Sequence, residues 1–332
     1  MKPPFLITID TEGANLRAAP AQITTENARW LPRFQALSEK YGLRPTYLTT
    51  YEMARCPVFV PFGREVLRRN AGEIGAHLHA WNSPPLESIT SNDNLCGPYA
   101  TEYPAGLLLE KVRCLTRLLE DTFEVQMTSH RAGRWGFDGV YAGALLDRGY
   151  VVDCSVTPGV SWKSSLGNPA GAGGPDYTDA PGEPYFVDLA DIRRPGASKL
   201  LEVPVTIMST APRLVDRIRK RLPQRALPRR VLNRLFPPLT WLRPARGAGA
   251  AAVLSVLDRA REEGRACVEF MLHSSELMPG GSPSFTDEES IEKLYGVLDT
   301  LFAAAAAEFS AATLTEFATT IIPTLQLADR AR

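Results

Sequence analysis

Residues 5–12 read FLITIDTE, an apolar and β-branched run that ends in two carboxylates. A run of this length and composition is typical of a buried β-strand followed by polar residues. Six further segments of the chain show the same pattern. The full set of predicted strands is 5–10, 45–50, 73–80, 124–130, 150–155, 200–208 and 267–273.

Helical segments lie between these strands, with apolar residues at helical spacing and with capping residues or glycine at their ends. The predicted helices are residues 24–41, 102–121, 138–148, 253–263 and 286–302. Strands that alternate with helices predict a mostly parallel sheet, either an open doubly wound sheet or a closed barrel. No G-x-G-x-x-G or Walker motif follows a strand, so nucleotide binding has no support in the sequence.

The composition of the 332 residues is that of a soluble globular protein, with 44% hydrophobic residues, 22% charged residues and a formal net charge of zero. The neutral balance removes any general electrostatic reason to expect nucleic-acid binding. The chain shows neither a secretory leader nor an apolar run of the roughly 20 residues that span a bilayer. Its five cysteines are scattered without a C-x-x-C pair, which argues against disulfides and a thiolate zinc site. We therefore expect a cytoplasmic protein with reduced thiols.

The polar residues of interest lie where the predicted strands end, which is where parallel α/β folds bind their ligands. All four histidines of the chain occupy such positions. The candidates are Asp10, Glu12, His77, His79, His130, Arg131, Asp153 and His273. Scattered surface histidines would not gather at one kind of position, so the pattern predicts a functional site at the carboxyl ends of the strands.

Two pairs of these residues share the i, i+2 spacing that turns side chains to the same face of a strand: Asp10 with Glu12, and His77 with His79. Taken singly, each residue has an ordinary structural explanation, as a cap, an ion-pair partner or a half-buried polar group. Taken together, they form a mixed nitrogen and oxygen ligand set that suits zinc, with cobalt, manganese or nickel as alternatives. Three protein ligands leave coordination positions open for water and substrate, as in catalytic metal sites.

Five short motifs then indicate a family. The segments ITIDTEG, HLH, HRAGRWG, DCS and MLHSSEL occur in this order. They resemble the five motifs of the polysaccharide deacetylases, the NodB-homology carbohydrate esterases of family 4, in a divergent D-x-E and H-x-H form. The resemblance spans residues 5–320 apart from two insertions. It implies a distorted seven-stranded (β/α) barrel and a metal-dependent enzyme that removes N-acetyl, sometimes O-acetyl, groups from sugars.

The first motif implies two roles. Asp10 matches the leading aspartate, which is the general base of the family. The usual metal-binding aspartate comes next, where this chain has Thr11. We therefore assign the metal role to Glu12, and Asp10 itself remains an alternative ligand.

The second motif of the family holds two histidines four residues apart. His77 matches the first of them, and the place of the second is taken by Trp81, which cannot bind metal. We therefore predict that His79 replaces the missing ligand.

The remaining motifs imply acid–base and pocket residues. Arg131 matches the arginine that orients the base, and His273 matches the general acid that protonates the leaving amine. Asp153 matches the residue that holds this acid in place, with a simple turn residue as the alternative. The substrate pocket is expected to include Trp81, His130, Arg134 and Trp135.

Two stretches interrupt the alternation, and we expect one deacetylase-type domain over residues 1–332 that contains both. Residues 157–196 are rich in Gly, Pro, Asp and Ser and are interpreted as long loops that determine the substrate. Residues 211–246 contain ten arginines and one lysine against a single acid, Asp216, with apolar residues at helical spacing. They are interpreted either as amphipathic helices that contact an anionic membrane or glycolipid, or as a solvated charged face over the barrel.

Three hypotheses for function remain from the sequence. The first is a metal-dependent hydrolase that deacetylates a glycan or a lipid-linked envelope polysaccharide precursor. The second is an allantoinase-like hydrolase of a small cyclic amide, and the third is a non-catalytic glycan-binding relative. Metal content separates the first hypothesis from the other two. The sequence names neither the sugar, the physiological metal nor the oligomeric state.

Overall fold

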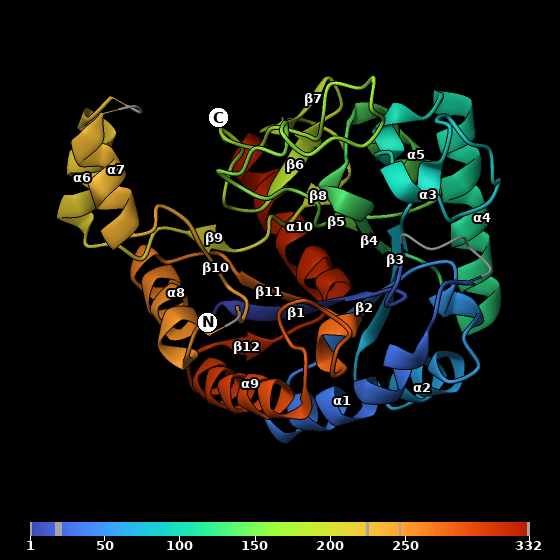
Figure 1. Ribbon diagram of the computed structural model, residues 1–332, viewed down its shortest axis with the longest axis horizontal. Helices are drawn as coiled ribbons and strands as arrows, with labels where there is room; N and C mark the ends of the chain where they lie inside the picture. The colour runs from blue at the N-terminus through green and yellow to red at the C-terminus, as the bar shows by residue number, and fades with distance from the viewer. Residues whose placement is uncertain (1, 17–21, 224–225, 246, 331–332) are drawn as a thin grey trace.

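A curved sheet of parallel strands forms the centre of the molecule (Figure 1). The computed structural model describes residues 2–16, 22–223, 226–245 and 247–330. Neighbouring parallel strands follow the order β11-β1-β2-β3-β4-β5-β8. Their bounds are β1 Pro4–Thr11, β2 Pro45–Thr49, β3 Glu73–Leu78, β4 Ser129–Ala132, β5 Val152–Asp153, β8 Leu201–Glu202 and β11 Val268–His273. Each lies within or overlaps a strand predicted from the sequence.

The two edges of this parallel array come close together after β8. The backbone N–H of Thr206 donates to the carbonyl oxygen of Glu269 at 3.3 Å. The backbone N–H of Glu269 in turn donates to Thr206 Oγ1 at 2.8 Å. Because β11 begins the array and Thr206 follows its last parallel strand, these bonds bring the sheet around on itself. The distorted (β/α) barrel that the motifs imply is thereby confirmed, and the open doubly wound alternative is wrong.

Helices flank the strands and cover the outside of the sheet (Figure 1). The longer ones are α1 Leu31–Lys40, α2 Phe59–Arg68, α4 Ala105–Phe123, α5 Gly139–Leu146, α8 Ala250–Glu263, α9 Glu288–Glu308 and α10 Leu314–Arg330. The short ones are η2 Glu26–Trp30, η3 Met53–Arg55, α3 Asp93–Cys96, η4 Ala100–Glu102, η5 Gly133–Trp135 and η6 Ser274–Leu277. Helix α2 escaped prediction because Pro61 and Gly63 lie in its first turns and imitate a loop. No described helix is both long and apolar enough to cross a bilayer.

Helix α10, which was also not predicted, closes one end of the barrel. Its Leu314 and Phe317 pack in a buried cluster with Leu6, Leu48 and Val152. Leu6 and Val152 lie near the amino ends of β1 and β5. The amino end of the barrel is therefore sealed by apolar packing, which leaves the carboxyl end for a site.

The two insertions take different forms. Residues 157–196 contain an antiparallel hairpin, β6 Tyr185–Asp188 and β7 Asp191–Pro195, and β6 pairs antiparallel with β8. The predicted basic insertion, 211–246, forms helices α6 Arg213–Arg221 and α7 Leu227–Leu235; its residues 224–225 and 246 lie outside the described residues. The predicted strand 200–208 is divided, because its end leaves the barrel as β9 Ile207–Met208 and pairs with β10 Thr240–Trp241. A short β12, Ser310–Ala311, pairs with β1.

Candidate functional site

Three predicted metal ligands meet at the carboxyl end of the barrel. Glu12 Oε2 lies 2.8 Å from His79 Nε2 and 3.3 Å from His77 Nε2. One ligand atom from each of the three residues lies within 4.8 Å of the others, and all three side chains are buried. Among the described residues, this is the group of His, Cys, Asp or Glu side chains that could hold a metal ion. The structure thus brings together the D-x-E and H-x-H segments, as their spacing predicts.

The hydrogen bonding of His77 suits metal binding. His77 Nδ1 lies 2.9 Å from the carbonyl oxygen of Arg131, so Nδ1 carries the proton and the lone pair lies on Nε2. His79 has a buried Nδ1 without a hydrogen-bond partner in the described structure. A mixed set of imidazole nitrogen and carboxylate oxygen is the donor chemistry that zinc and related divalent ions prefer. The residues present therefore fit a divalent cation.

Asp10 lies beside this group and is held by a buried arginine. Arg131 Nη1 donates to Asp10 Oδ1 at 2.6 Å, and Arg131 Nη2 contacts Glu269 Oε1. The Arg131 side chain is fully buried, so its charge acts in a medium of low dielectric constant. Burial raises the pKa of Asp10, but the charge of Arg131, followed by that of His77, outweighs burial and lowers the pKa below its ordinary value. Asp10 is therefore ionised at neutral pH.

His273 faces Asp10 from the neighbouring strand. The residues pair in register across β1 and β11, and His273 Nε2 lies 3.7 Å from Asp10 Oδ2. His273 Nδ1 lies 3.1 Å from Glu276 Oε2, and Arg243 pairs with the same carboxylate at 2.7 Å. Burial lowers the pKa of His273, but the hydrogen bond to Glu276 and nearby carboxylates outweigh it and raise the pKa to about 9. His273 is therefore a protonated imidazolium at neutral pH.

Asp153, which was expected to hold His273 in place, contacts a different histidine. Asp153 lies 2.6 Å from His130 Nδ1, and His130 Nε2 lies 2.9 Å from the hydroxyl of Tyr141. His130 and Asp153 are neighbours in register on β4 and β5, so they share a face of the sheet. Arg131 follows His130 and points to the opposite face, where it meets Asp10. Asp153 is thus a partner of His130, and Glu276 occupies the place expected for it.

His130 does not line the cavity at the site. Burial lowers the pKa of His130 despite its hydrogen bond to Asp153, so the imidazole is neutral at pH 7. Its ring packs against Tyr141 and Tyr150, with centroid separations of 5.0 and 5.9 Å. Because the cavity beside Glu12 is lined by other residues, His130 stands as a structural residue rather than a pocket residue.

An aromatic wall surrounds the remaining cavity, which has a volume of about 280 Å³. Its aromatic residues are Trp81, Tyr99, Trp135 and Trp162. Trp81 packs on His79 with ring centroids 4.5 Å apart, and its indole N–H donates to the carbonyl oxygen of Leu16 at 2.9 Å. A second hollow of about 590 Å³ shares Trp135, Trp162 and His273 with the cavity and continues past Trp241. The cavity is therefore the inner end of a longer aromatic groove.

Arg134 lines the cavity but directs its donors toward the long loop. Its Nη2 donates to Ser165 Oγ at 2.9 Å and to the carbonyl oxygen of Leu166 at 3.0 Å. Its guanidinium carbon lies 4.2 Å from the centre of the Tyr99 ring. Arg134 therefore fixes the loop of residues 157–196 against the cavity wall, with fewer donors left for a substrate.

Several residues that support the site were not predicted. Asn27 Nδ2 donates to the carbonyl oxygen of Glu12 at 2.8 Å, and the N–H of Glu12 donates to Ser274 Oγ at 3.1 Å. The N–H of Gly13 donates to Glu52 Oε1 at 2.8 Å. These bonds fix the backbone that carries Glu12 after β1 ends. Side-chain contacts between distant segments have no local sequence signal, whereas Glu276 is signalled by its position three residues after His273.

Comparisons with known proteins find similar folds among solved structures but no match by sequence. No protein-family model and no curated protein matches the sequence. A solved structure from Mycobacterium smegmatis, with a provisional assignment as a polysaccharide deacetylase, has a TM-score of 0.53 and 14% identity over 98% of this chain and 94% of its own. A provisional glycoside hydrolase/deacetylase from Parabacteroides distasonis has a TM-score of 0.58 and 11% identity over 96% of this chain and 71% of its own.

A third neighbour shows how widely this architecture occurs. The 4-alpha-glucanotransferase from Thermococcus litoralis has a TM-score of 0.50 and 12% identity, over 96% of this chain and 40% of its own. At such low identities the matches establish the fold alone. The chain thus shares the distorted (β/α) barrel fold of these solved structures, and its activity must be argued from the site.

Proposed function

We propose that the protein is a metal-dependent hydrolase that removes N-acetyl, or O-acetyl, groups from a glycan. The class includes lipid-linked precursors of envelope polysaccharide, and the proposal places the enzyme in the cytoplasm. The observation that carries it is the convergence of three functions at one point of the barrel. A potential metal set of Glu12, His77 and His79 lies beside an ionised carboxylate, Asp10, and a protonated imidazole, His273. A site that only bound sugars would not require this acid–base pair.

The proposed metal ligands are Glu12, His77 and His79, with zinc as the first candidate and cobalt, manganese or nickel as alternatives. A cation held there supplies Lewis acidity to the acyl group and makes water more acidic. The hydrogen bond from His77 to the Arg131 carbonyl keeps the ligand tautomer fixed. The aromatic walls of the cavity limit the contact of the site with bulk water, which strengthens the electrostatic interactions inside it.

The protein side chains then divide the proton transfers between them. Asp10 is ionised by Arg131, so it accepts a proton from the attacking water. His273 is protonated because of Glu276, so it donates a proton to the leaving nitrogen as the C–N bond breaks. The two groups lie 3.7 Å apart and can flank one scissile bond. The groove past Trp241 offers space for the remaining part of a glycan.

The test combines metal content with turnover. After growth with zinc, cobalt or manganese, emission spectrometry of the purified protein is expected to find close to one equivalent of metal. Acetate release from an N-acetylglucosamine oligosaccharide is expected to depend on that metal. Asp10→Asn should retain the metal and lose about 10²- to 10⁴-fold in turnover, as expected for removal of a general base.

Three outcomes would contradict the proposal. Metal below about a tenth of an equivalent after supplementation would leave a non-catalytic glycan-binding relative or an allantoinase-like enzyme, and an allantoin ring-opening assay separates these two. Full activity in Asp10→Asn would remove Asp10 as the base. Full metal content in His79→Ala would remove His79 from the ligand set while leaving the fold assignment intact.

A further inference from the structure

Helices α6 and α7 form a pair that stands away from the barrel (Figure 1). We call them the basic helix pair. A buried arginine holds the two helices together: Arg219 Nε donates to Asn233 Oδ1 at 3.0 Å, and Arg219 Nη2 donates to the carbonyl oxygen of Phe236 at 2.6 Å. Arg219 also forms an ion pair with Asp216. The pair is therefore a built structure rather than two independent charged helices.

The basic helix pair carries exposed apolar side chains in rows. Thirteen large hydrophobic residues are exposed in the described chain, and five of them lie on these two short helices. They are Leu214, Ile218, Leu227, Val231 and Leu235, with exposed fractions of 42% to 71%. Residues four apart in a helix lie on one face, so each helix presents a continuous apolar row to the solvent.

Four of these apolar residues have an arginine three positions later in the sequence. The pairs are Leu214 and Arg217, Ile218 and Arg221, Leu227 and Arg230, and Val231 and Arg234. All four arginines are exposed, and none forms an ion pair with a described residue. Arg217 lies where the apolar row of α6 meets the cleft between the helix pair and the barrel. Because i, i+3 neighbours share a helix face, each apolar row is flanked by arginines. The same arrangement thus occurs independently on both helices.

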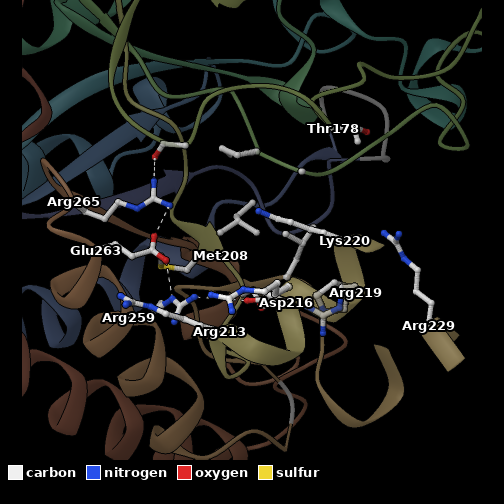
Figure 2. A pocket seen from close by; sticks show the side chains of 18 residues that line it. Thr178, Met208, Arg213, Asp216, Arg219, Lys220, Arg229, Arg259, Glu263 and Arg265 are labelled. Carbon is white, nitrogen blue, oxygen red and sulfur yellow. Dashed lines mark hydrogen bonds and ion pairs between the residues drawn. The ribbon is translucent and has the colours of Figure 1, made fainter. Parts of the chain in front are cut away.

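The side of the pair that faces the barrel adds further positive charge. It borders a cleft of about 780 Å³ whose acids are Asp216 and Glu263 (Figure 2). Asp216 pairs with Arg219 and lies 3.7 Å from Arg259, and Glu263 pairs with Arg259 at 2.7 Å. The basic residues that line the cleft are Arg213, Arg217, Arg219, Lys220, Arg229, Arg259 and Arg265. The acids are therefore already engaged, and a positive excess remains around the pair.

We propose that the basic helix pair docks on the surface of a bilayer that contains anionic phospholipid. Apolar rows enter the boundary between headgroups and acyl chains while flanking arginines contact phosphates, which is the pattern of interfacial helices. A purely solvated face would not keep five large apolar side chains in rows. A second copy of the chain would oppose arginines to arginines, which repels. The inference goes beyond the proposed function, because none of the catalytic groups depends on it.

Co-sedimentation of the full chain with phospholipid vesicles tests the inference. Vesicles of phosphatidylcholine with phosphatidylglycerol are expected to bind the protein, and vesicles of phosphatidylcholine alone to bind it much more weakly. Binding should weaken as salt is raised, because screening reduces attraction between exposed charges. Arg217→Gln, Arg221→Gln, Arg230→Gln and Arg234→Gln should each weaken binding roughly fivefold. Combined Leu227→Ser and Leu235→Ser should weaken it about tenfold or more.

Matched controls lie on the other side of the molecule. Leu109→Ser on α4 and Arg148→Gln after α5 remove an exposed leucine and an exposed arginine from surfaces remote from the basic helix pair. They are expected to leave vesicle binding unchanged, and circular dichroism should show that every variant is folded. Equal binding to both kinds of vesicle, or loss of binding in the controls, would overturn the proposal. Self-association that requires Leu227 and Leu235, without vesicle binding, would overturn it as well.

Discussion

Two histidine–carboxylate pairs lie on neighbouring strands, and only one of them faces the cavity. His79 lies 2.8 Å from Glu12, and His130 lies 2.6 Å from Asp153. Both pairs are buried, so neither burial nor pairing distinguishes them. The difference lies in what surrounds each pair: the second ring nitrogen of His130 contacts the Tyr141 hydroxyl, whereas His79 and Glu12 line the cavity together with His77.

This comparison separates chemistry from packing. An imidazole with both nitrogens satisfied contributes to the stability of a fold, and exchanging a partner costs free energy without adding reactivity. An imidazole whose Nε2 faces a carboxylate and a second imidazole at a cavity, as that of His79 does, can bind a cation there. We therefore expect substitutions in the first pair to change metal content and turnover. Substitutions in the second pair should change the free energy of unfolding.

The largest expected effect is a loss of turnover and bound metal when the pair of His79 and Glu12 is changed. Glu12→Gln removes the carboxylate that contacts both His77 and His79. Because a Lewis acid is worth several kcal/mol of transition-state stabilisation, turnover should fall about a thousandfold or more, and bound metal should fall with it. Emission spectrometry and acetate release measure the two quantities on the same preparation. A variant that kept its metal would instead favour Asp10 as the carboxylate ligand.

The next largest effect is a loss of stability when the pair of His130 and Asp153 is changed. His130→Ala leaves the Asp153 carboxylate and the Tyr141 hydroxyl without their shared partner and opens a cavity. The free energy of unfolding should fall by about 3 kcal/mol, as measured by urea denaturation of the metal-free protein. Metal content should stay at the wild-type value. In the matched variant His79→Ala, the same denaturation midpoint should move much less, so equal losses in the two variants would erase the distinction drawn between the pairs.

The sequence predicts the barrel well because its strand pattern is strong. Residues 5–10 and 267–273, for example, become the neighbouring strands β1 and β11, which pair in parallel register. Their polar ends meet there because parallel strands point the same way, which also brings Asp10 and His273 together. The proximity of His77 and His79 was predictable too, since the two residues are two apart and share a face, whereas the replacement of the second motif histidine by His79 stays a prediction.

The missed parts of the site have equally physical causes. Alternation along a strand sends His130 and Arg131 to opposite faces, so the position of both at a strand end could not make both of them site residues. The assignment of Asp153 rested on family order, whereas register places it beside His130. Glu276 reaches back to His273 because η6 turns the chain immediately after β11. The position of Glu276 three residues after His273 signals this contact, but the turn that brings the two side chains together is needed to decide between the two carboxylates.

The smallest expected effect is a shift in the pH dependence of activity, and it tests whether Glu276, rather than Asp153, is the partner of His273. Glu276→Gln removes the hydrogen-bonded carboxylate that, together with Glu12 and Asp10 and against the opposing effect of burial, raises the pKa of His273 to about 9. As a general acid His273 must be protonated, so activity is present below its pKa and is lost as pH rises through it. Loss of a hydrogen bond to a charged group should move this alkaline limit down by about one to two pH units. The profile of kcat/KM against pH measures the shift.

A matched carboxylate on the surface provides the control for this profile. Glu289→Gln on α9 removes an exposed charge, whose side chain is 78% exposed, so the alkaline limit should stay at the wild-type value. Asp153→Asn should also leave the limit in place, because Asp153 contacts His130 and not His273. A shift in Asp153→Asn without one in Glu276→Gln would restore the pairing that the family motif implies. It would also mean that His273 leaves Glu276 during turnover.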